Sequence, residues 1–176
     1  IFPKETFVKA GELGFMGMYT PEDVGGMNLG RLDTAVILEE LASGCTSTAA
    51  FISIHNMATW MIASWGTQGV KDTWCGDLVM GTKLASYCLT EPGAGSDIMS
   101  MSTKAVEKGD DYLISGMKHF ISTPCLPDFA IVFAATGVDE TPRGPRKRVT
   151  AFLVDRGEKG FDIQLGPTCA AQRAYR

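Results

Sequence analysis

The pattern of apolar residues changes near Lys83, and this change limits the folds that the chain can adopt. Before it, apolar residues recur at helical spacing, and Gly, Pro or a small polar residue stands where helices would begin or end. After it, short β-branched or apolar runs alternate with glycines, which is typical of strands joined by turns. We therefore predict an α+β fold, with an all-α helical domain over residues 1–83 and a β domain over residues 84–176.

The first half predicts a series of helices around one loop. Residues 20–30 are rich in Pro, Gly and Asn and are expected to form that loop. Asp33 or Thr34 is expected to cap the helix that follows it. Residues 47–65 are apolar on most faces, which indicates a helix buried on several sides, and Thr67 is expected to cap a further helix.

The second half predicts short strands. The runs that carry this signal are residues 112–114, 131–134, 149–154 and 161–165. Their spacing is typical of an antiparallel sheet or barrel. A basic cluster precedes the third run, and it consists of Arg143, Arg146, Lys147 and Arg148. We expect this cluster to be a solvated loop, because Pro and Gly flank it and no aromatic residues are interleaved.

Charge and cysteine usage exclude several classes of function. The formal net charge of −4 over 176 residues provides no positive field for nucleic acid. The five cysteines form no CxxC pair, and their odd number and wide spacing argue for a reducing compartment. His55 and His119 are too few and too distant to indicate a metal site or to favour a catalytic Cys/His pair. We expect His55 to lie on the buried helix as a packed histidine whose ring nitrogens are hydrogen-bonded.

No membrane anchor or signal peptide is expected. Residues 1–9 already have the character of a helix, and the longest apolar stretch, residues 49–63, is short and interrupted by polar residues. The sequence does not begin with Met, so we expect a processed or truncated chain.

The segment with the clearest chemical character is residues 87–97, which read Tyr-Cys-Leu-Thr-Glu-Pro-Gly-Ala-Gly-Ser-Asp. A short strand leads into a loop where Gly93 and Gly95 permit unusual backbone conformations and close approach of a ligand. Successive N–H groups there could form an anion-binding nest, beside the hydroxyl of Ser96. The alternative is a tight turn in which Glu91 and Asp97 are solvated or capping carboxylates.

The sequence of this segment closely resembles the signature of the acyl-CoA dehydrogenase family. Further segments resemble the same family in the same order, namely residues 21–26, 38–42, 54–56, 65–67 and 118–122. Residues 44–48 and 52–57 are most similar to the isobutyryl-CoA, or short branched-chain, dehydrogenase branch. The resemblance implies a helical N-terminal domain, a β-barrel-like middle domain and a C-terminal helical bundle, of which this chain holds the first two.

The resemblance also implies an FAD site. The residues that it assigns to FAD are Tyr87, Cys88, Leu89, Thr90, Gly95, Ser96, Phe120, Ile121 and Ser122.

The resemblance gives several of these residues a role. Leu89 and Thr90 would bond the pyrimidine edge of the flavin, and fixed donors there favour its reduced state. Ser96 would lie near both the FAD pyrophosphate and the CoA part of the substrate. Phe120 would pack on the isoalloxazine, although core packing is the alternative from the residues alone, and Ser122 would point toward N5.

Two segments depart from the family pattern. Residues 123–125 replace a small or Gly-containing turn, and Pro124 removes a backbone donor, which leaves the loop path after Ser122 open. Arg173 follows a poorly matching stretch and is assigned no role.

The implied reaction is FAD-dependent α,β-dehydrogenation of an acyl-CoA thioester. The family's base is a Glu in the C-terminal domain, so no catalytic residue is assigned here, and Glu91 is not expected to be the base. We therefore expect a fragment that is inactive by itself. The resemblance implies an electron-transfer flavoprotein as electron acceptor, a homotetramer or homodimer, and the bacterial cytoplasm or mitochondrial matrix.

Two alternatives remain open from the sequence. One is a flavin monooxygenase or oxidase of the same fold, in which reduced flavin reacts with oxygen. The other is a non-catalytic flavin-binding or scaffold subunit.

Overall fold

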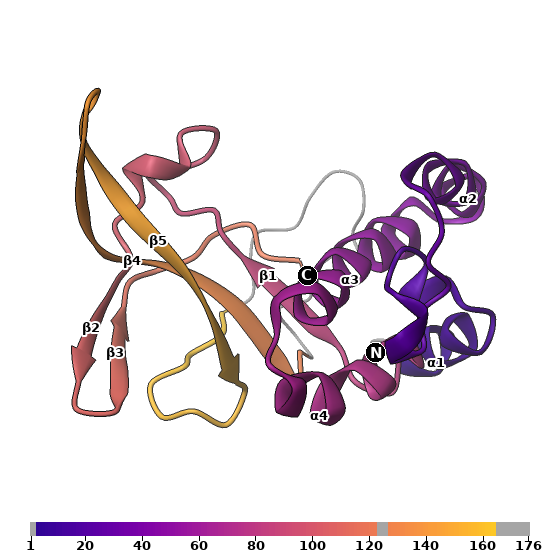
Figure 1. Cartoon of the computed structure of the whole chain (residues 1–176). Coiled ribbons are helices and arrows are strands. Elements are labelled where there is room, and N and C mark those ends of the chain that lie inside the picture. The colour runs from indigo at the N-terminus through magenta and orange to yellow at the C-terminus, as the bar shows by residue number, and fades with distance from the viewer. Residues whose placement is uncertain (1–2, 123–126, 165–176) are drawn as a thin grey trace. The chain divides into compact units, whose positions relative to one another are not determined.

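The computed structural model describes residues 3–122 and 127–164. Contacts divide the chain into two compact units (Figure 1). Among the described residues, the helical unit contains residues 3–87, 122, 127–128 and 162–164. The sheet unit contains residues 88–121 and 129–161. The order of a helical part followed by a β part is as predicted, and the boundary between residues 83 and 84 stays a prediction.

The helical unit contains four α-helices and two short 3-10 helices. Their bounds are α1 Lys4–Glu12, η1 Phe15–Gly17, η2 Glu22–Val24, α2 Arg31–Gly44, α3 Thr46–Trp65 and α4 Gln68–Val79. The predicted helix over residues 47–65 corresponds to α3. Thr67 caps α4 as expected, because its Oγ1 accepts a hydrogen bond from the Val70 N–H at 3.4 Å.

The prediction for the start of α2 is wrong. The N-cap is Gly30, and its N–H donates to Asp33 Oδ2 at 3.2 Å. Asp33 is therefore not the N-cap residue. From the third helical position, its carboxylate accepts a hydrogen bond from the N–H of the N-cap. Thr34 is buried, and its hydroxyl donates to the Gly30 carbonyl at 3.0 Å.

The core of the helical unit is apolar and aromatic. Phe7 from α1 and Phe51 from α3 have ring centroids 4.1 Å apart. Burial of such side chains is the main favourable term in folding. The other buried members of this cluster are Ala10, Met16, Met18, Ile52 and Leu84.

Three polar side chains of α3, those of His55, Asn56 and Thr59, are completely buried. Asn56 Oδ1 accepts from the Met18 N–H at 2.7 Å, and its Nδ2 donates to the Phe15 carbonyl at 2.7 Å and the Ile52 carbonyl at 2.9 Å. Asn56 therefore fixes the turn around η1 to the middle of α3. Its neighbour His55 is packed, as expected from the sequence.

The described strands form one mixed sheet. Their bounds are β1 Ala85–Cys88, β2 Lys104–Lys108, β3 Asp111–Ser115, β4 Phe129–Thr141 and β5 Gly144–Asp155, with η3 Ile98–Ser100 before β2. The strand order is β1-β4-β2-β3, and β5 pairs with β4. Figure 1 shows the long β4–β5 hairpin and the short β2–β3 hairpin. A cluster formed by Cys88, Ala130 and Val132 is buried in the sheet unit.

The strand pairing shows where the sheet differs from the antiparallel sheet or barrel predicted from the sequence. β4 and β5 are antiparallel, with Phe129 opposite Asp155, and a bulge falls between Ala135 and Gly137. β2 and β4 are parallel, with Lys104 opposite Ala135, so the sheet is not wholly antiparallel.

Two local predictions in this half are wrong. Residues 161–164 form no strand; Phe161 instead packs against the Cys88 cluster. The basic cluster is not a loop, because three of the four cluster residues lie within β5, which begins at Gly144. Lys147 Nζ donates to the Met101 carbonyl at 2.7 Å, and Arg148 pairs with Asp139, so these two side chains have protein partners.

Among the residues that the structure describes, no helix combines the length and apolar character needed to cross a membrane.

Candidate functional site

The motif at residues 89–97 contains a tight turn. The Glu91 N–H donates to the Ala94 carbonyl at 2.9 Å, and the Ala94 N–H donates to the Glu91 carbonyl at 3.2 Å. Neither Gly93 nor Gly95 adopts the left-handed backbone region, so the conformational reason predicted for these glycines is wrong. A Cβ on either would meet open space, and Gly95 is exposed, which leaves room for a ligand.

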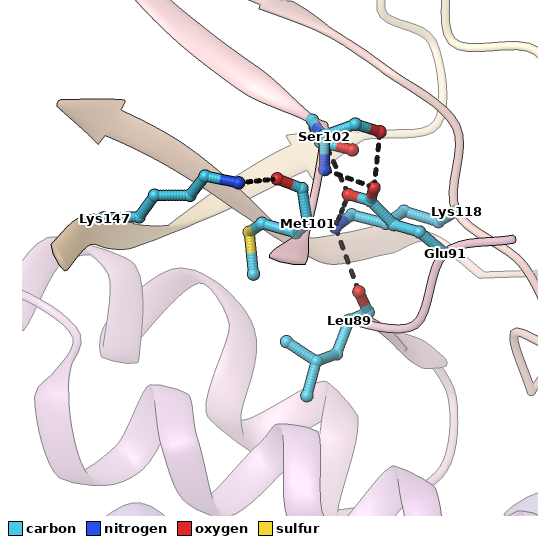
Figure 2. Close-up of polar contacts among 7 residues, drawn as sticks. Leu89, Glu91, Met101, Ser102, Lys118 and Lys147 are labelled. Carbon is cyan, nitrogen blue, oxygen red and sulfur yellow. Dashed lines mark hydrogen bonds and ion pairs between the residues drawn. The ribbon is translucent and has the colours of Figure 1, made fainter. Parts of the chain in front are cut away.

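The carboxylate of Glu91 is buried, and it is neither solvated nor a helix cap. Its Oε2 accepts from the N–H and the hydroxyl of Ser102, both at 2.6 Å. Its Oε1 accepts from the Thr103 N–H at 3.0 Å and from Lys118 Nζ at 2.8 Å. Figure 2 shows these contacts converging on one carboxylate. Asp97, by contrast, does cap η3, since its Oδ1 accepts from the Met99 N–H.

Lys118 and Glu91 form a buried ion pair, with side chains 9% and 1% exposed. Burial alone would raise the pKa of Glu91, but the hydrogen bonds from Lys118, Ser102 and Thr103 outweigh it and hold this pKa well below its usual range. Glu91 is thus an ionised carboxylate with all its hydrogen bonds directed into the protein. This arrangement supports the expectation that Glu91 is not a catalytic base.

Lys118 also joins the two segments of the predicted flavin site. Its Nζ donates to the Leu89 carbonyl at 3.0 Å (Figure 2). The next residue repeats the link, because the His119 N–H donates to the Thr90 carbonyl at 2.8 Å. These two bonds occupy the carbonyl oxygens of Leu89 and Thr90. The half-buried Thr90 hydroxyl makes no hydrogen bond within the described part of the chain, so it can serve a ligand.

Phe120 is exposed and strained. Its φ is +54°, in the left-handed region that large side chains rarely adopt, and the residue is 74% exposed. The His119 and Phe120 rings lie 4.0 Å apart between centroids. The core-packing alternative for Phe120 is therefore wrong. Backbone strain of this kind is concentrated at ligand-binding and catalytic sites.

The other predicted residues lie in different surroundings. Cys88 is buried in the sheet core, where burial raises the pKa of its thiol to about 12 and keeps it protonated. Ile121 is half-buried against the same cluster. Ser96 is exposed in the loop after the turn.

Tyr87 and Ser122 belong to the helical unit, whereas the other seven predicted residues belong to the sheet unit. Tyr87 is half-buried, and this burial raises the pKa of its phenol. Ser122 is buried, and its carbonyl accepts a hydrogen bond from the Ser86 hydroxyl at 3.0 Å. The predictions for residues 123–125 and for Arg173 fall outside the described residues.

Gly116 supports this network by permitting close packing. A Cβ on Gly116 would lie 2.3 Å from Thr103 Oγ1 and 2.7 Å from Thr103 Cα. Gly116→Ala must therefore displace the backbone that donates to Glu91. We expect a loss of about 1–3 kcal/mol in the free energy of unfolding.

Urea unfolding would measure this loss, with Gly157→Ala as the matched control. A Cβ on Gly157 meets no atom within 4 Å, so this change should stay within about 0.5 kcal/mol. Equal stabilities for the two variants would show that the packing around Thr103 is loose.

No group of His, Cys, Asp and Glu side chains within residues 3–122 and 127–164 is arranged to hold a metal ion. Open hollows beside the β4–β5 hairpin are lined by Met99, Thr141 and the exposed Arg143 and Arg146. They are distinct from the network around Glu91.

Known proteins similar to this chain share both of its parts. The model for "Acyl-CoA dehydrogenase, N-terminal domain" matches residues 1–82, and that for "Acyl-CoA dehydrogenase, middle domain" matches residues 86–174. The mitochondrial isobutyryl-CoA dehydrogenase of Bos taurus is 46% identical over 163 residues, which are 93% of this chain and 38% of that protein. The Dictyostelium discoideum protein of the same name is 45% identical, over 92% of this chain and 38% of its own length.

A solved structure agrees with these relatives. The glutaryl-CoA dehydrogenase of Mycobacterium smegmatis, in complex with FADH2, has a TM-score of 0.88 and 27% identity, over 99% of this chain and 43% of that one. The chain therefore spans less than half the length of these relatives. The two domain models follow one another in the order of the helical and β parts, and the chain belongs to the acyl-CoA dehydrogenase family.

Proposed function

We propose that this chain contributes part of the flavin-binding wall of an enzyme that carries out FAD-dependent α,β-dehydrogenation of acyl-CoA thioesters. The observation that carries the proposal is Phe120, an aromatic residue that is 74% exposed on a strained backbone. An exposed aromatic face held this way loses contact with water when a planar ring packs on it. Family membership points to the isoalloxazine of FAD as that ring.

The residues around Phe120 fit the polar edge of a flavin. The Thr90 hydroxyl is available as a donor, whereas the Leu89 and Thr90 carbonyls are held by Lys118 and His119. A flavin edge that gains negative charge on reduction needs donors rather than acceptors. FAD, when bound, would supply the redox chemistry of the reaction.

The remaining assignments follow from the loop and from the relatives. The exposed hydroxyl of Ser96 would bind the FAD pyrophosphate and the CoA part of the substrate. Two relatives are named isobutyryl-CoA dehydrogenase, which supports a short branched acyl chain as substrate. We also propose an electron-transfer flavoprotein as electron acceptor, a homotetramer or homodimer, and the bacterial cytoplasm or the mitochondrial matrix as location.

The test is FAD binding by wild type and Phe120→Ala in the full polypeptide that carries this sequence. Stacking on an aromatic ring contributes about 1–3 kcal/mol, so the variant should bind FAD about 5- to 150-fold more weakly. Leu113→Ala is the control, because Leu113 is a 59% exposed side chain of β3 in the same unit. It should bind FAD as wild type does.

The reaction is tested on the flavin-loaded wild type. Isobutyryl-CoA should bleach the flavin absorbance and support reduction of a dye acceptor. Absence of FAD binding by wild type would overturn the proposal. Oxygen consumption without dye reduction would favour the oxidase or monooxygenase alternative.

A further inference from the structure

Glu91 and Lys118 form a buried network between the two segments that make up the candidate flavin wall. Lys118 Nζ lies 3.0 Å from the Leu89 carbonyl and 2.8 Å from Glu91 Oε1 (Figure 2). One ammonium group thereby ties the residues just before the turn to the residues just before Phe120. The His119–Thr90 backbone bond of 2.8 Å is the second tie between the same segments.

The network is anchored to the sheet on its other side. Glu91 accepts from the Ser102 and Thr103 N–H groups at 2.6 and 3.0 Å. The Thr103 carbonyl in turn accepts from the Ala135 N–H of β4 at 2.9 Å. Lys147 of β5 holds the adjacent Met101 carbonyl at 2.7 Å, as Figure 2 shows. The position of Glu91 is therefore set by β4 and β5 through residues 101–103.

A buried ion pair of this kind is a poor source of net stability. Removing two charges from water costs about as much as their attraction returns, and apolar replacements of such pairs are often neutral. The pair instead restricts geometry, because five hydrogen bonds to Glu91 and Lys118 must form together. Such restriction has its largest effect where a ligand must be met by groups on two separate segments.

We propose that Glu91 and Lys118 are positioning residues, which hold the Thr90 donor and the Phe120 ring at the separation that a flavin requires. This inference rests on the proposed flavin function. Neither residue is assigned contact with the cofactor. Their effect reaches it through Leu89, Thr90 and the backbone that leads to Phe120.

The experiment uses the double variant Glu91→Gln/Lys118→Met in the full polypeptide, beside each single variant. Each single change leaves unpaired polar groups or an uncompensated charge in the interior, so both should lower the melting temperature. The double variant contains no buried charge at these positions and should recover the part of that loss that comes from the uncompensated charge. The rest should remain, because a glutamine amide has one oxygen and leaves either the Ser102 or the Thr103 N–H without an acceptor. The double variant should nevertheless bind FAD about tenfold or more weakly than wild type, since the tie from Lys118 to Leu89 is gone.

The reduction potential of the bound flavin is the readout that a purely structural role would leave unchanged. We expect it to move to more negative values in the double variant, because the pyrimidine-edge donor is less well placed for the reduced flavin. The control is Asp139→Asn, which breaks the exposed pair with Arg148 in the same unit. It should leave FAD affinity and potential at the wild-type values.

Two results would overturn the inference, and they can be told apart. A double variant with wild-type FAD affinity and potential would make Glu91 and Lys118 part of the fold only, with the proposed function intact. A wild type that binds no FAD would overturn the proposed function as well.

Discussion

Lowering the pH from about 7 to about 5 should remove about 2 kcal/mol from the free energy of unfolding through His55 alone. His55 is completely buried, and burial lowers its pKa to about 4, while the Leu78 carbonyl and Asp128 only partly oppose the shift. Between that value and the unfolded pKa of about 6.5, the unfolded chain binds the additional proton. Stability from His55 is therefore complete above about pH 6.5 and is lost as the pH falls, to a total of about 3 kcal/mol.

The geometry shows why protonation is unfavourable. His55 Nε2 lies 2.9 Å from the Leu78 carbonyl, and the Ala85 N–H donates to Nδ1 at 3.4 Å. A second ring proton would face the Ala85 N–H, with no acceptor in place. This contact links α3 to the end of α4 and to the start of β1.

Urea unfolding at a series of pH values would measure the effect in wild type and in His55→Gln. Glutamine can donate to Leu78 and accept from Ala85 but does not titrate in this range. The variant should therefore lose most of the pH dependence between about pH 7 and 5. The same slope in both proteins would show that His55 is not the group responsible.

Asn56→Ala should lower the free energy of unfolding by about 2–4 kcal/mol. The change removes three hydrogen bonds, leaves the buried Met18 N–H without its acceptor, and deprives the Phe15 carbonyl of its donor. Urea unfolding followed by tryptophan fluorescence would report it, because Trp60 and Trp65 lie on the same helix.

Gln68→Ala is the matched control for an amide side chain. Gln68 donates to Asp72 at 2.7 Å on the exposed surface of α4, so its removal should change stability by no more than about 0.5 kcal/mol. If the two variants were equally stable, the buried contacts of Asn56 would contribute no more than exposed ones.

Periodicity predicted the elements whose packing follows directly from local pattern. The apolar run over residues 47–65 became α3, Thr67 capped α4, and the run over residues 131–134 became the buried start of β4. Parallel pairing of β2 with β4 could not be predicted, because it brings Lys104 beside Ala135, which is distant in the chain. Phe161 satisfied an apolar pattern by packing without entering a strand.

The candidate site shows the same division. The resemblance located the Leu89–Ser96 and Phe120–Ser122 segments but gave no role to Lys118. From the residues alone, a solvated or capping Glu91 was the alternative to a ligand-binding loop. The burial of Glu91 was not predicted, because its hydrogen-bond donors lie 11 to 27 residues away and no local pattern indicates them. The sequence did offer one signal. One of the two segments contains a carboxylate and the other a lysine, and these can pair if both segments line the same site.

Hydrogen–deuterium exchange with and without FAD tests the central claim most directly, in the full polypeptide that carries this sequence. Our account predicts that FAD slows amide exchange in peptides covering residues 89–96 and 118–122, and leaves the β2–β3 hairpin unchanged. Slower exchange in other peptides, with both of these segments unaffected, would contradict it.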